Sequence, residues 1–262
     1  MHIYFKARAC IKKYEFLFFT LIQKQFILRY RRTLLGYLWN ILNPLIALTI
    51  LALVFSRLFG QDPREFAIFL FSGLVAFNFF SASLSIGSTT FLMHHGLIDK
   101  VYVPKILFPL TVITSAVIDS FLVFIALLLV MFFLGSPISL SLLVLPVSYL
   151  ALIIFTFGLT LIVSITTVFF RDFQQVLPYI LQSLFFLSPI LYPKTNFTDP
   201  IMSLILNINP ISVYVELFRA PINEGRAPDL VFFYYGFSYG LVSLAVGLFI
   251  FLKCKHLIIC RL

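Results

Sequence analysis

The sequence predicts an all-α, polytopic membrane protein. Of its 262 residues, 61% are hydrophobic and only 11% are charged, whereas a water-soluble domain carries about 25% charged residues. The mean hydropathy is +1.05, and several apolar runs exceed the roughly 20 residues that a helix needs to cross a bilayer. Because these runs are continuous and do not alternate every second residue, they favour helices over the strands of a barrel.

Six apolar runs, bounded by charged residues or by Gly and Pro, predict six transmembrane helices within a single membrane domain, residues 1–262. The fifth run contains Pro178 and Pro189, which predict a kink. The six expected spans are approximately 37–58, 66–91, 106–134, 140–169, 173–192 and 230–252.

The charges predict the orientation of these spans. With both termini inside, fourteen Lys and Arg residues fall on the inner side and five on the outer side. The positive-inside rule therefore places both ends of the chain in the cytoplasm. The basic residues flank the spans and form no stripe with interleaved aromatic residues, so we expect them to meet membrane lipids and not nucleic acid.

Residues 10–32 predict a helix that is too charged to cross the membrane and lies in its surface. Lys13, Lys24 and Arg31 cluster on one side of this helix. The opposite side is apolar and aromatic, with Phe16, Phe19, Ile22, Phe26 and Tyr30. The segment is either an anchor that orients the first span or a docking platform for a cytoplasmic partner.

The inner loop 94–105 is short, polar and bent by Pro104. It is either a plain connector or a short surface helix on which a partner pushes. The adjacent His94 and His95 could suggest a metal site, but no carboxylate or Cys stands at ligand spacing, so we expect none.

The outer segment 193–229 is too apolar for a solvated loop and too short for two spans. Two half-helices that dip back into the outer leaflet would satisfy both limits. Because irregular backbone at that depth needs protein or a water-filled cavity around it, we expect these pieces to line or cap a pathway.

Asp119 is the one ionisable side chain well inside a predicted span. It is a candidate functional group, or it makes a structural hydrogen bond with Ser115, Ser120 or a neighbouring helix. A single such group weakens a proton-coupled carrier, which usually needs more than one. No catalytic constellation and no Gly-rich loop ending in Gly-Lys-Ser or Gly-Lys-Thr is present, so we expect no catalytic residue and no bound cofactor.

Aromatic residues make up 18% of the chain. Because the C–H faces of sugar rings stack on aromatic rings, a pore lined by Phe and Tyr could pass a polysaccharide without gripping any one residue. Most rings should nevertheless face lipid, pack in the core or anchor the interface. The candidate channel residues are Tyr37, Trp39, Phe77, Tyr179, Phe185, Phe186 and Tyr192.

Four ordered strings cover nearly the whole chain: residues 29–44; residues 97–109; residues 170–182 continuing into 188–193; and Asn209-Pro210 followed by Glu216-Leu-Phe-Arg219. Together they resemble the permease subunits of type-2 ABC exporters of polysaccharide, which carry O antigen, capsular polysaccharide or teichoic acid. The inner loop departs from that pattern, with Val103 and Lys105 where an aromatic residue and Arg are common. This departure bears on the identity of the partner.

The resemblance implies a homodimeric permease of the bacterial inner membrane, with six spans per subunit and two copies of a separate ATPase that binds ATP and Mg. The cargo would be a lipid-linked polysaccharide, with O antigen first among the candidates. By the same resemblance, residues 10–32 form an interface helix, 94–105 a coupling helix and 200–225 a pair of outer gate helices. The implied ATPase contacts are His94, His95, Asp99, Lys100, Lys105, Lys13 and Lys24, and the implied gate residues are Asn209, Pro210, Glu216 and Arg219.

Two further readings stay open. Arg29, Arg31 and Arg32 either bind the pyrophosphate headgroup of a lipid carrier or simply obey the positive-inside rule. The alternatives to polysaccharide export are an ATP-independent carrier or lipid flippase that uses Asp119, and an ABC permease for drugs or small lipids.

Overall fold

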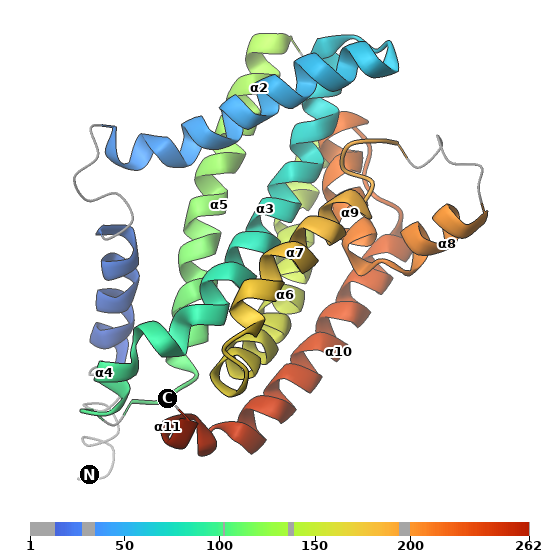
Figure 1. The fold of residues 1–262 in the computed structure, drawn as a ribbon. Coiled ribbons are helices and arrows are strands. Elements are labelled where there is room, and N and C mark those ends of the chain that lie inside the picture. The colour runs from blue at the N-terminus through green and yellow to red at the C-terminus, as the bar shows by residue number, and fades with distance from the viewer. Residues whose placement is uncertain (1–13, 28–34, 102, 136–138, 194–199, 262) are drawn as a thin grey trace, which may run out of the picture.

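The structure is a computed structural model that describes residues 14–27, 35–101, 103–135, 139–193 and 200–261. Within these ranges the chain forms α-helices and short 3-10 helices and no strands. Four long helices, of residues 63–93, 107–134, 145–169 and 230–254, run side by side as a bundle, and the long helix of residues 39–59 crosses one end of it (Figure 1). The helix of residues 14–27, α4 (His95–Ile98) and the C-terminal helix α11 (Leu257–Arg261) lie at the other end. The predicted all-α class is confirmed.

Five helices among the described residues are long and apolar enough to cross a membrane. Each matches a predicted span to within a few residues, which confirms a polytopic membrane protein. Gly60 and Gly135 end two of them in the left-handed conformation that glycine adopts without strain. The five are α2 (Trp39–Phe59, preceded by the 3-10 turn Gly36–Leu38), α3 (Pro63–Met93), α5 (Leu107–Leu134), α6 (Leu145–Phe169, preceded by the 3-10 turn Leu140–Val144) and α10 (Leu230–Cys254).

The fifth predicted helix, 173–192, is shorter than expected. Helix α7 (Phe173–Phe186) has 14 residues and therefore spans about 21 Å, less than the roughly 30 Å of a bilayer core. It stops early because Pro189 has no amide hydrogen to donate and disfavours helical backbone in the residue before it. The predicted end at residue 192 was therefore wrong, and Pro178 lies inside α7.

Two short helices occupy the segment 193–229 that was expected to lie outside, α8 (Pro200–Ile208) and α9 (Pro210–Asn223). Helix α9 is deeply buried, with Tyr214 and Phe218 fully covered. Two hydrogen bonds attach it to the bundle: Ser148 Oγ donates to Leu217 O (3.1 Å), and Tyr214 Oη donates to Gly236 O (2.8 Å). Helix α9 is thus part of the packed structure, whereas α8 exposes Ile201, Leu204 and Ile208.

At the opposite end, a separate apolar cluster joins the ends of several long helices to the shorter segments beside them. Leu21 of the helix 14–27, Ile98 of α4 (His95–Ile98), Phe108 of α5 and Ile258 of α11 (Leu257–Arg261) belong to it. The expected coupling helix 94–105 is therefore helical over only four residues, with turns and Pro104 after them.

The amphipathic helix also differs from its prediction, because its protein-facing side is formed by Leu21 and Ile22. Phe16 and Phe19 are 76% and 56% exposed, so they face away from the bundle, as side chains in the acyl boundary would. Lys13, Tyr30 and Arg31 lie outside the described residues.

Candidate functional site

A row of polar side chains runs along α3 at its midpoint. Asn78 and Ser85 are exposed and Ser81 is half-buried, and their spacing places them on one side of the helix. Gln182 of α7 is also exposed. Within the described part of the chain none of these four side chains has a hydrogen-bond partner. Because an amide in hydrocarbon is costly, this face of the molecule needs water or a polar ligand.

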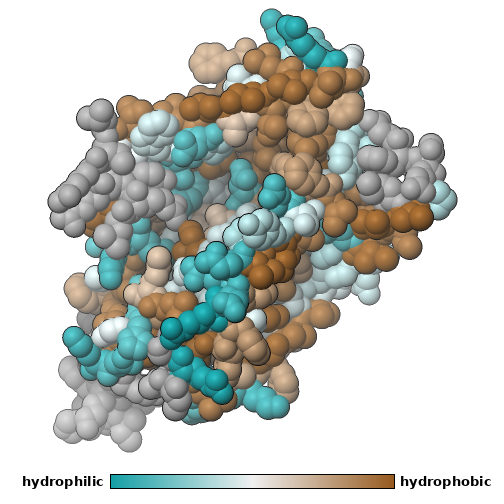
Figure 2. All heavy atoms as spheres, in the orientation of Figure 1, coloured by the Kyte–Doolittle hydropathy of each residue, from teal (hydrophilic) through white to brown (hydrophobic). Residues whose placement is uncertain are grey.

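A cavity of about 360 Å³ opens between α3 and α7 on this face. Ser81, Ser85 and Gln182 supply its polar lining, and Phe77, Phe185 and Phe186 supply aromatic rings. The rings of Phe77 and Phe185 pack edge to face, with their centroids 5.2 Å apart. Figure 2 shows hydrophilic residues gathered over the middle of this side of the molecule, between apolar surfaces. The cavity thus offers hydrogen-bonding groups and aromatic faces together.

A second cavity of about 330 Å³ lies between α2, α3 and α5. It shares Ser81 with the first, so the two adjoin. Asp119 lines it and accepts hydrogen bonds at Oδ1 from Tyr37 Oη (2.8 Å) and Asn40 Nδ2 (2.9 Å). The carboxylate therefore joins α5 to the start of α2, which agrees with a structural polar contact to a neighbouring helix.

The seven candidate channel aromatics fall into different places. Phe77, Phe185 and Phe186 line the first cavity and Trp39 the second, while Tyr179 projects from α7 with 72% of its surface exposed. Tyr37 is bound to Asp119, and Tyr192 Oη donates to Phe186 O (2.7 Å), next to the end of α7. Five of the seven therefore border the cavities or the exposed face of α7, and their role as liners stays a prediction.

The four gate residues lie on or beside α9. Asn209 caps its N-terminus by accepting from Ile211 N (3.0 Å), and Pro210 is its first residue. Arg219 is buried, with 4% of its surface exposed. Glu216 is 3.5 Å from Arg226 in the following loop.

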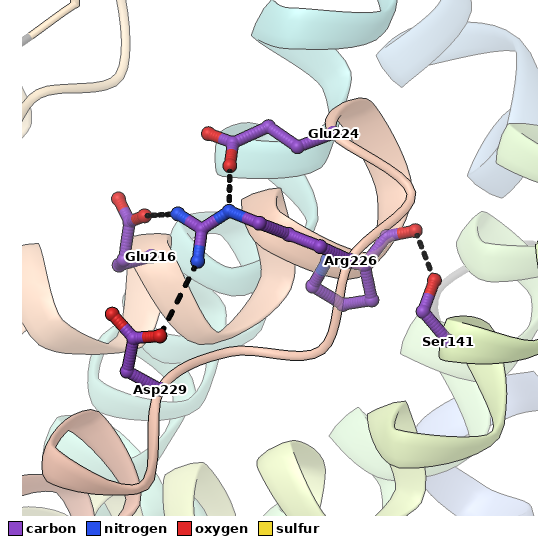
Figure 3. Close-up of polar contacts among 6 residues, drawn as sticks. Ser141, Glu216, Glu224, Arg226 and Asp229 are labelled. Atoms are coloured by element: carbon purple, nitrogen blue, oxygen red, sulfur yellow. Dashed lines mark hydrogen bonds and ion pairs between the residues drawn. The ribbon is translucent and has the colours of Figure 1, made fainter.

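Three carboxylates surround Arg226 in the loop between α9 and α10 (Figure 3). Glu224 lies 2.5 Å from its Nε, Glu216 3.5 Å from its Nη2 and Asp229 3.6 Å from its Nη1. The hydrogen bond and charge of Glu224 come first among the causes that raise the pKa of Arg226. The guanidinium is thus a fixed positive charge that ties the end of α9 to the start of α10.

The ABC-2 type transporter family model matches residues 16–223 of this chain. The chain belongs to that family. Its sequence is 32% identical over 222 residues to the O-antigen export system permease protein RfbA of Myxococcus xanthus, covering 83% of this chain and 84% of that protein. It is 30% identical over 226 residues to the polysialic acid transport protein KpsM of Escherichia coli, covering 84% and 86%. An RfbA of Klebsiella pneumoniae is 28% identical over 236 residues, covering 89% and 90%.

The predicted family is therefore confirmed. This ABC-2 type chain is a membrane permease and not an enzyme, as the sequence predicted. Family membership implies that ATP hydrolysis belongs to a partner subunit.

The expected ATPase contacts of this ABC-2 permease lie at the end that holds α4. His95, Asp99, Lys100 and Lys24 are exposed, and His95 Nδ1 is 3.1 Å from Asp99 Oδ2. Lys105 is instead engaged inside the chain, where its Nζ donates to the carbonyl of Lys255. Lys100 is thus the sharper docking candidate of the two lysines.

His94 is half-buried beside Phe108, and its Nδ1 donates a hydrogen bond to Thr90 O (2.8 Å). Burial lowers its pKa, and the positive charge of Lys24 acts in the same direction. Within the described ranges no group of three potential ligands could hold a metal. Lys13, Arg29, Arg31 and Arg32 lie outside those ranges.

The sequence analysis missed the polar row of α3 and Gln182. The signal was available, because Asn78, Ser81 and Ser85 recur at helical spacing inside an apolar run. Phe69 and Gly73, which surround Arg219, carried no signal, since an apolar residue and a glycine are ordinary in a membrane helix.

Proposed function

We propose that this chain is the membrane-spanning half of an ATP-driven exporter that moves lipid-linked polysaccharide, with lipopolysaccharide O antigen as the leading candidate, across a bacterial inner membrane. The observation that carries the proposal is the polar and aromatic face of α3 and α7. Its unpartnered amides and hydroxyls lie halfway along a membrane-length helix, where lipid could not hydrogen-bond to them. A passing polar chain, with its water, would supply those bonds.

The chemistry of this face suits a glycan. Sugar hydroxyls exchange hydrogen bonds with Asn78, Ser81 and Gln182, and sugar rings stack on Phe186 and Tyr179. None of these contacts depends on one particular sugar, so a long chain can slide through. The printed names of the relatives, O-antigen export and polysialic acid transport, point to the same class of cargo and support the proposal.

One copy of the chain provides one wall of such a conduit, because the polar face of α3 and α7 is open to the outside of the subunit. Helix α2 also exposes apolar side chains, among them Ile46, Ile50 and Leu53. A second copy would enclose the conduit. The proposed assembly is thus a homodimer whose subunits cross the membrane six times, the fifth time through the short helix α7 together with the turns that follow it. Both termini are cytoplasmic, and two ATPase subunits carry ATP and Mg.

In the proposed cycle, ATP closes the two ATPase subunits, which press on the inner segments 10–32 and 94–105. These segments share one apolar cluster with the inner ends of α5, α6 and α10, so a push on either would move the spans. Separation of the two subunits then opens the conduit.

The decisive experiment reconstitutes the purified chain with its ATPase in vesicles that contain the lipid-linked glycan. Glycan should become accessible on the far side only when ATP is hydrolysed. Passage of glycan through the chain alone, with no nucleotide and no companion, would end the proposal. It would instead favour an ATP-independent carrier, and loss of that passage in Asp119→Asn would identify the group responsible.

Lys100→Glu tests the docking surface separately. We expect glycan export to fall while the dimer stays intact, because the substitution reverses a charge on the exposed face beside α4. Lys253→Glu is the matched control, since Lys253 is also exposed but lies at the inner end of α10, outside this loop. Equal export by the two variants would exclude Lys100 from coupling.

Arg29, Arg31 and Arg32 are proposed to receive the pyrophosphate of the lipid carrier at the inner surface. Alanine at all three positions should slow export of the lipid-linked glycan without inverting the topology. If the triple variant keeps both its orientation and its normal export rate, these arginines serve only the positive-inside rule.

A further inference from the structure

The chain becomes buried just after α7 ends. Residues 187–193 form turns and bends. Ser188 and Ile190 have no exposed surface, Pro189 is buried, and Leu191 is 5% exposed. The last carbonyl groups of a helix lack partners within it. A buried carbonyl must find another donor, especially where lipid surrounds the protein.

Asn209 supplies the first of these donors from the start of α9. Its Nδ2 donates to Leu187 O (3.1 Å) and to Ser188 Oγ (2.9 Å). Its Oδ1 accepts from Ile211 N at the same time. One amide thus caps α9 and binds Leu187 and Ser188, the first two residues of the non-helical segment 187–193, which we call the break.

Arg219 supplies the next donors from almost three turns further along α9. Its Nη1 donates to Pro189 O (2.6 Å) and its Nη2 to Ile190 O (3.3 Å). Asn209 and Arg219 together therefore bind four consecutive residues of the break, 187–190.

Helix α3 completes the surroundings of Arg219. The guanidinium carbon stands 3.7 Å from the centroid of the Phe69 ring, as in a cation–π contact. At Gly73, one turn along, an added Cβ would lie 3.2 Å from Arg219 Nη2 and 3.6 Å from Ile190 Cα, so glycine leaves the room in which the guanidinium and the break meet.

The partners of this buried cation are carbonyl oxygens and an aromatic face. No carboxylate of the described residues lies within ion-pair distance of Arg219, and Glu216 is within that distance of Arg226. A planar guanidinium can donate in two directions to two successive carbonyls, whereas a lysine ammonium is a point charge without that fork. The site is therefore shaped for arginine.

We propose that Arg219 and Asn209 are positioning residues that latch the outer end of α7 to α9 and α3, and so keep the conduit sealed at its outer end until ATP is bound. This inference deepens the proposed function, because it assigns the resting seal of the same conduit. Since both residues bind the break, the outer end of α7 moves only together with α9.

The test measures leak and not export. The permease–ATPase complex is reconstituted in vesicles loaded with radiolabelled sucrose, and sucrose efflux is followed without nucleotide. Arg219→Met keeps the length of the stem but removes every donor, and we expect efflux to rise about tenfold, which corresponds to about 1.4 kcal/mol. Arg226→Met is the matched control, because Arg226 lies in the outer loop after α9 and does not touch the break.

Two milder variants keep the test decisive if Arg219→Met does not assemble. Asn209→Ser retains a cap for α9, but its side chain is too short to reach Leu187 O. Gly73→Ala removes no donor, but its new methyl group crowds the Arg219 guanidinium. Both should leak more than the wild type while the folded dimer persists.

If the folded variants release sucrose no faster than the wild type, the proposal is overturned. It is also overturned if all three variants fail to assemble and none of them raises sucrose efflux at any protein level. The sucrose assay contains no glycan, so its outcome is independent of the proposed cargo. Failure of ATP-driven glycan export with a normal latch would refute the proposed function alone.

Discussion

Two helix contacts of this permease are built in opposite ways. Helices α6 and α10 touch backbone to backbone: a Cβ added to Gly247 would lie 2.3 Å from Gly158 O, and a Cβ added to Gly158 would lie 2.4 Å from Ser243 C. Helices α3 and α7 instead border a cavity of about 360 Å³ lined by polar and aromatic side chains. The α6–α10 contact therefore leaves no space for water or a ligand between the helices, whereas the α3–α7 contact does.

We call the close α6–α10 contact the scaffold and the α3–α7 face that borders the cavity the wall. Close approach of small residues is how helices associate in a membrane, where no hydrophobic force drives them together. Ser243 strengthens that contact by donating from Oγ to Phe155 O (2.7 Å) across the two helices. The α3–α7 face has no such bond at Asn78 or Gln182 within the described residues. We therefore expect stability to depend on α6 and α10, and transport on α3 and α7.

The largest expected effect is at the scaffold. Gly247→Ala should destabilise the folded permease by about 3 kcal/mol, because the new Cβ meets backbone atoms that cannot rotate away. Thermal unfolding in detergent measures the loss. Gly96→Ala is the control, since nothing lies within 4 Å of its added Cβ. Equal unfolding midpoints for the two variants would contradict the backbone contact.

At the wall we expect the reverse pattern. Asn78→Leu combined with Gln182→Leu should leave the unfolding midpoint unchanged and lower ATP-driven glycan export about tenfold, the consequence of about 1.4 kcal/mol added to the barrier. The cause is the loss of hydrogen bonds to the passing chain. Export at the wild-type rate by this double variant would remove α3 and α7 from the conduit.

A smaller effect is expected for the hydrogen bond between Ser243 of α10 and Phe155 of α6. Ser243→Ala should cost about 0.6 kcal/mol of stability, the average of measured hydrogen bonds between membrane helices. Ser238→Ala on the same helix is the matched control, because that hydroxyl donates to Tyr235 O within its own helix. A loss in Ser238→Ala as large as in Ser243→Ala would mean that the bond between helices contributes nothing of its own.

The smallest effect concerns pH at the end of the bundle that holds α4. Burial lowers the pKa of His94 below its value in the unfolded chain, so folding favours the neutral imidazole. This contribution is present above the unfolded pKa of about 6.5 and is lost as pH falls below it. The unfolding midpoint should drop between pH 7.5 and pH 5.5 in the wild type and less in His94→Gln, with His95→Gln as control. The same drop in all three proteins would exclude His94 as the cause.

The long apolar runs predicted five helices almost to the residue, because the length of a bilayer span and its exclusion of charge are written directly in the chain. The end of α7 was misplaced at 192, although Pro189 was visible, because apolar character continues past the break. Asn209 and Arg219 were identified as gate residues by resemblance, yet their shared partner, the break at 187–190, could not be inferred. That pairing joins residues about 20 to 30 positions apart across a turn of the chain.

The sequence by itself determined that the chain resides in the membrane, where five of its long helices lie and which family it joins, because each follows from local composition or from ordered strings. Only the tertiary structure decided which polar side chains stay unpartnered and which are satisfied. Asn78 and Arg219 are both polar residues in apolar surroundings, and nothing in their sequence neighbourhoods separates them. Arg219 meets two backbone carbonyls brought to it by another segment, whereas Asn78 borders an open cavity. A hydrogen bond depends on distance in space, and a sequence gives only distance along the chain.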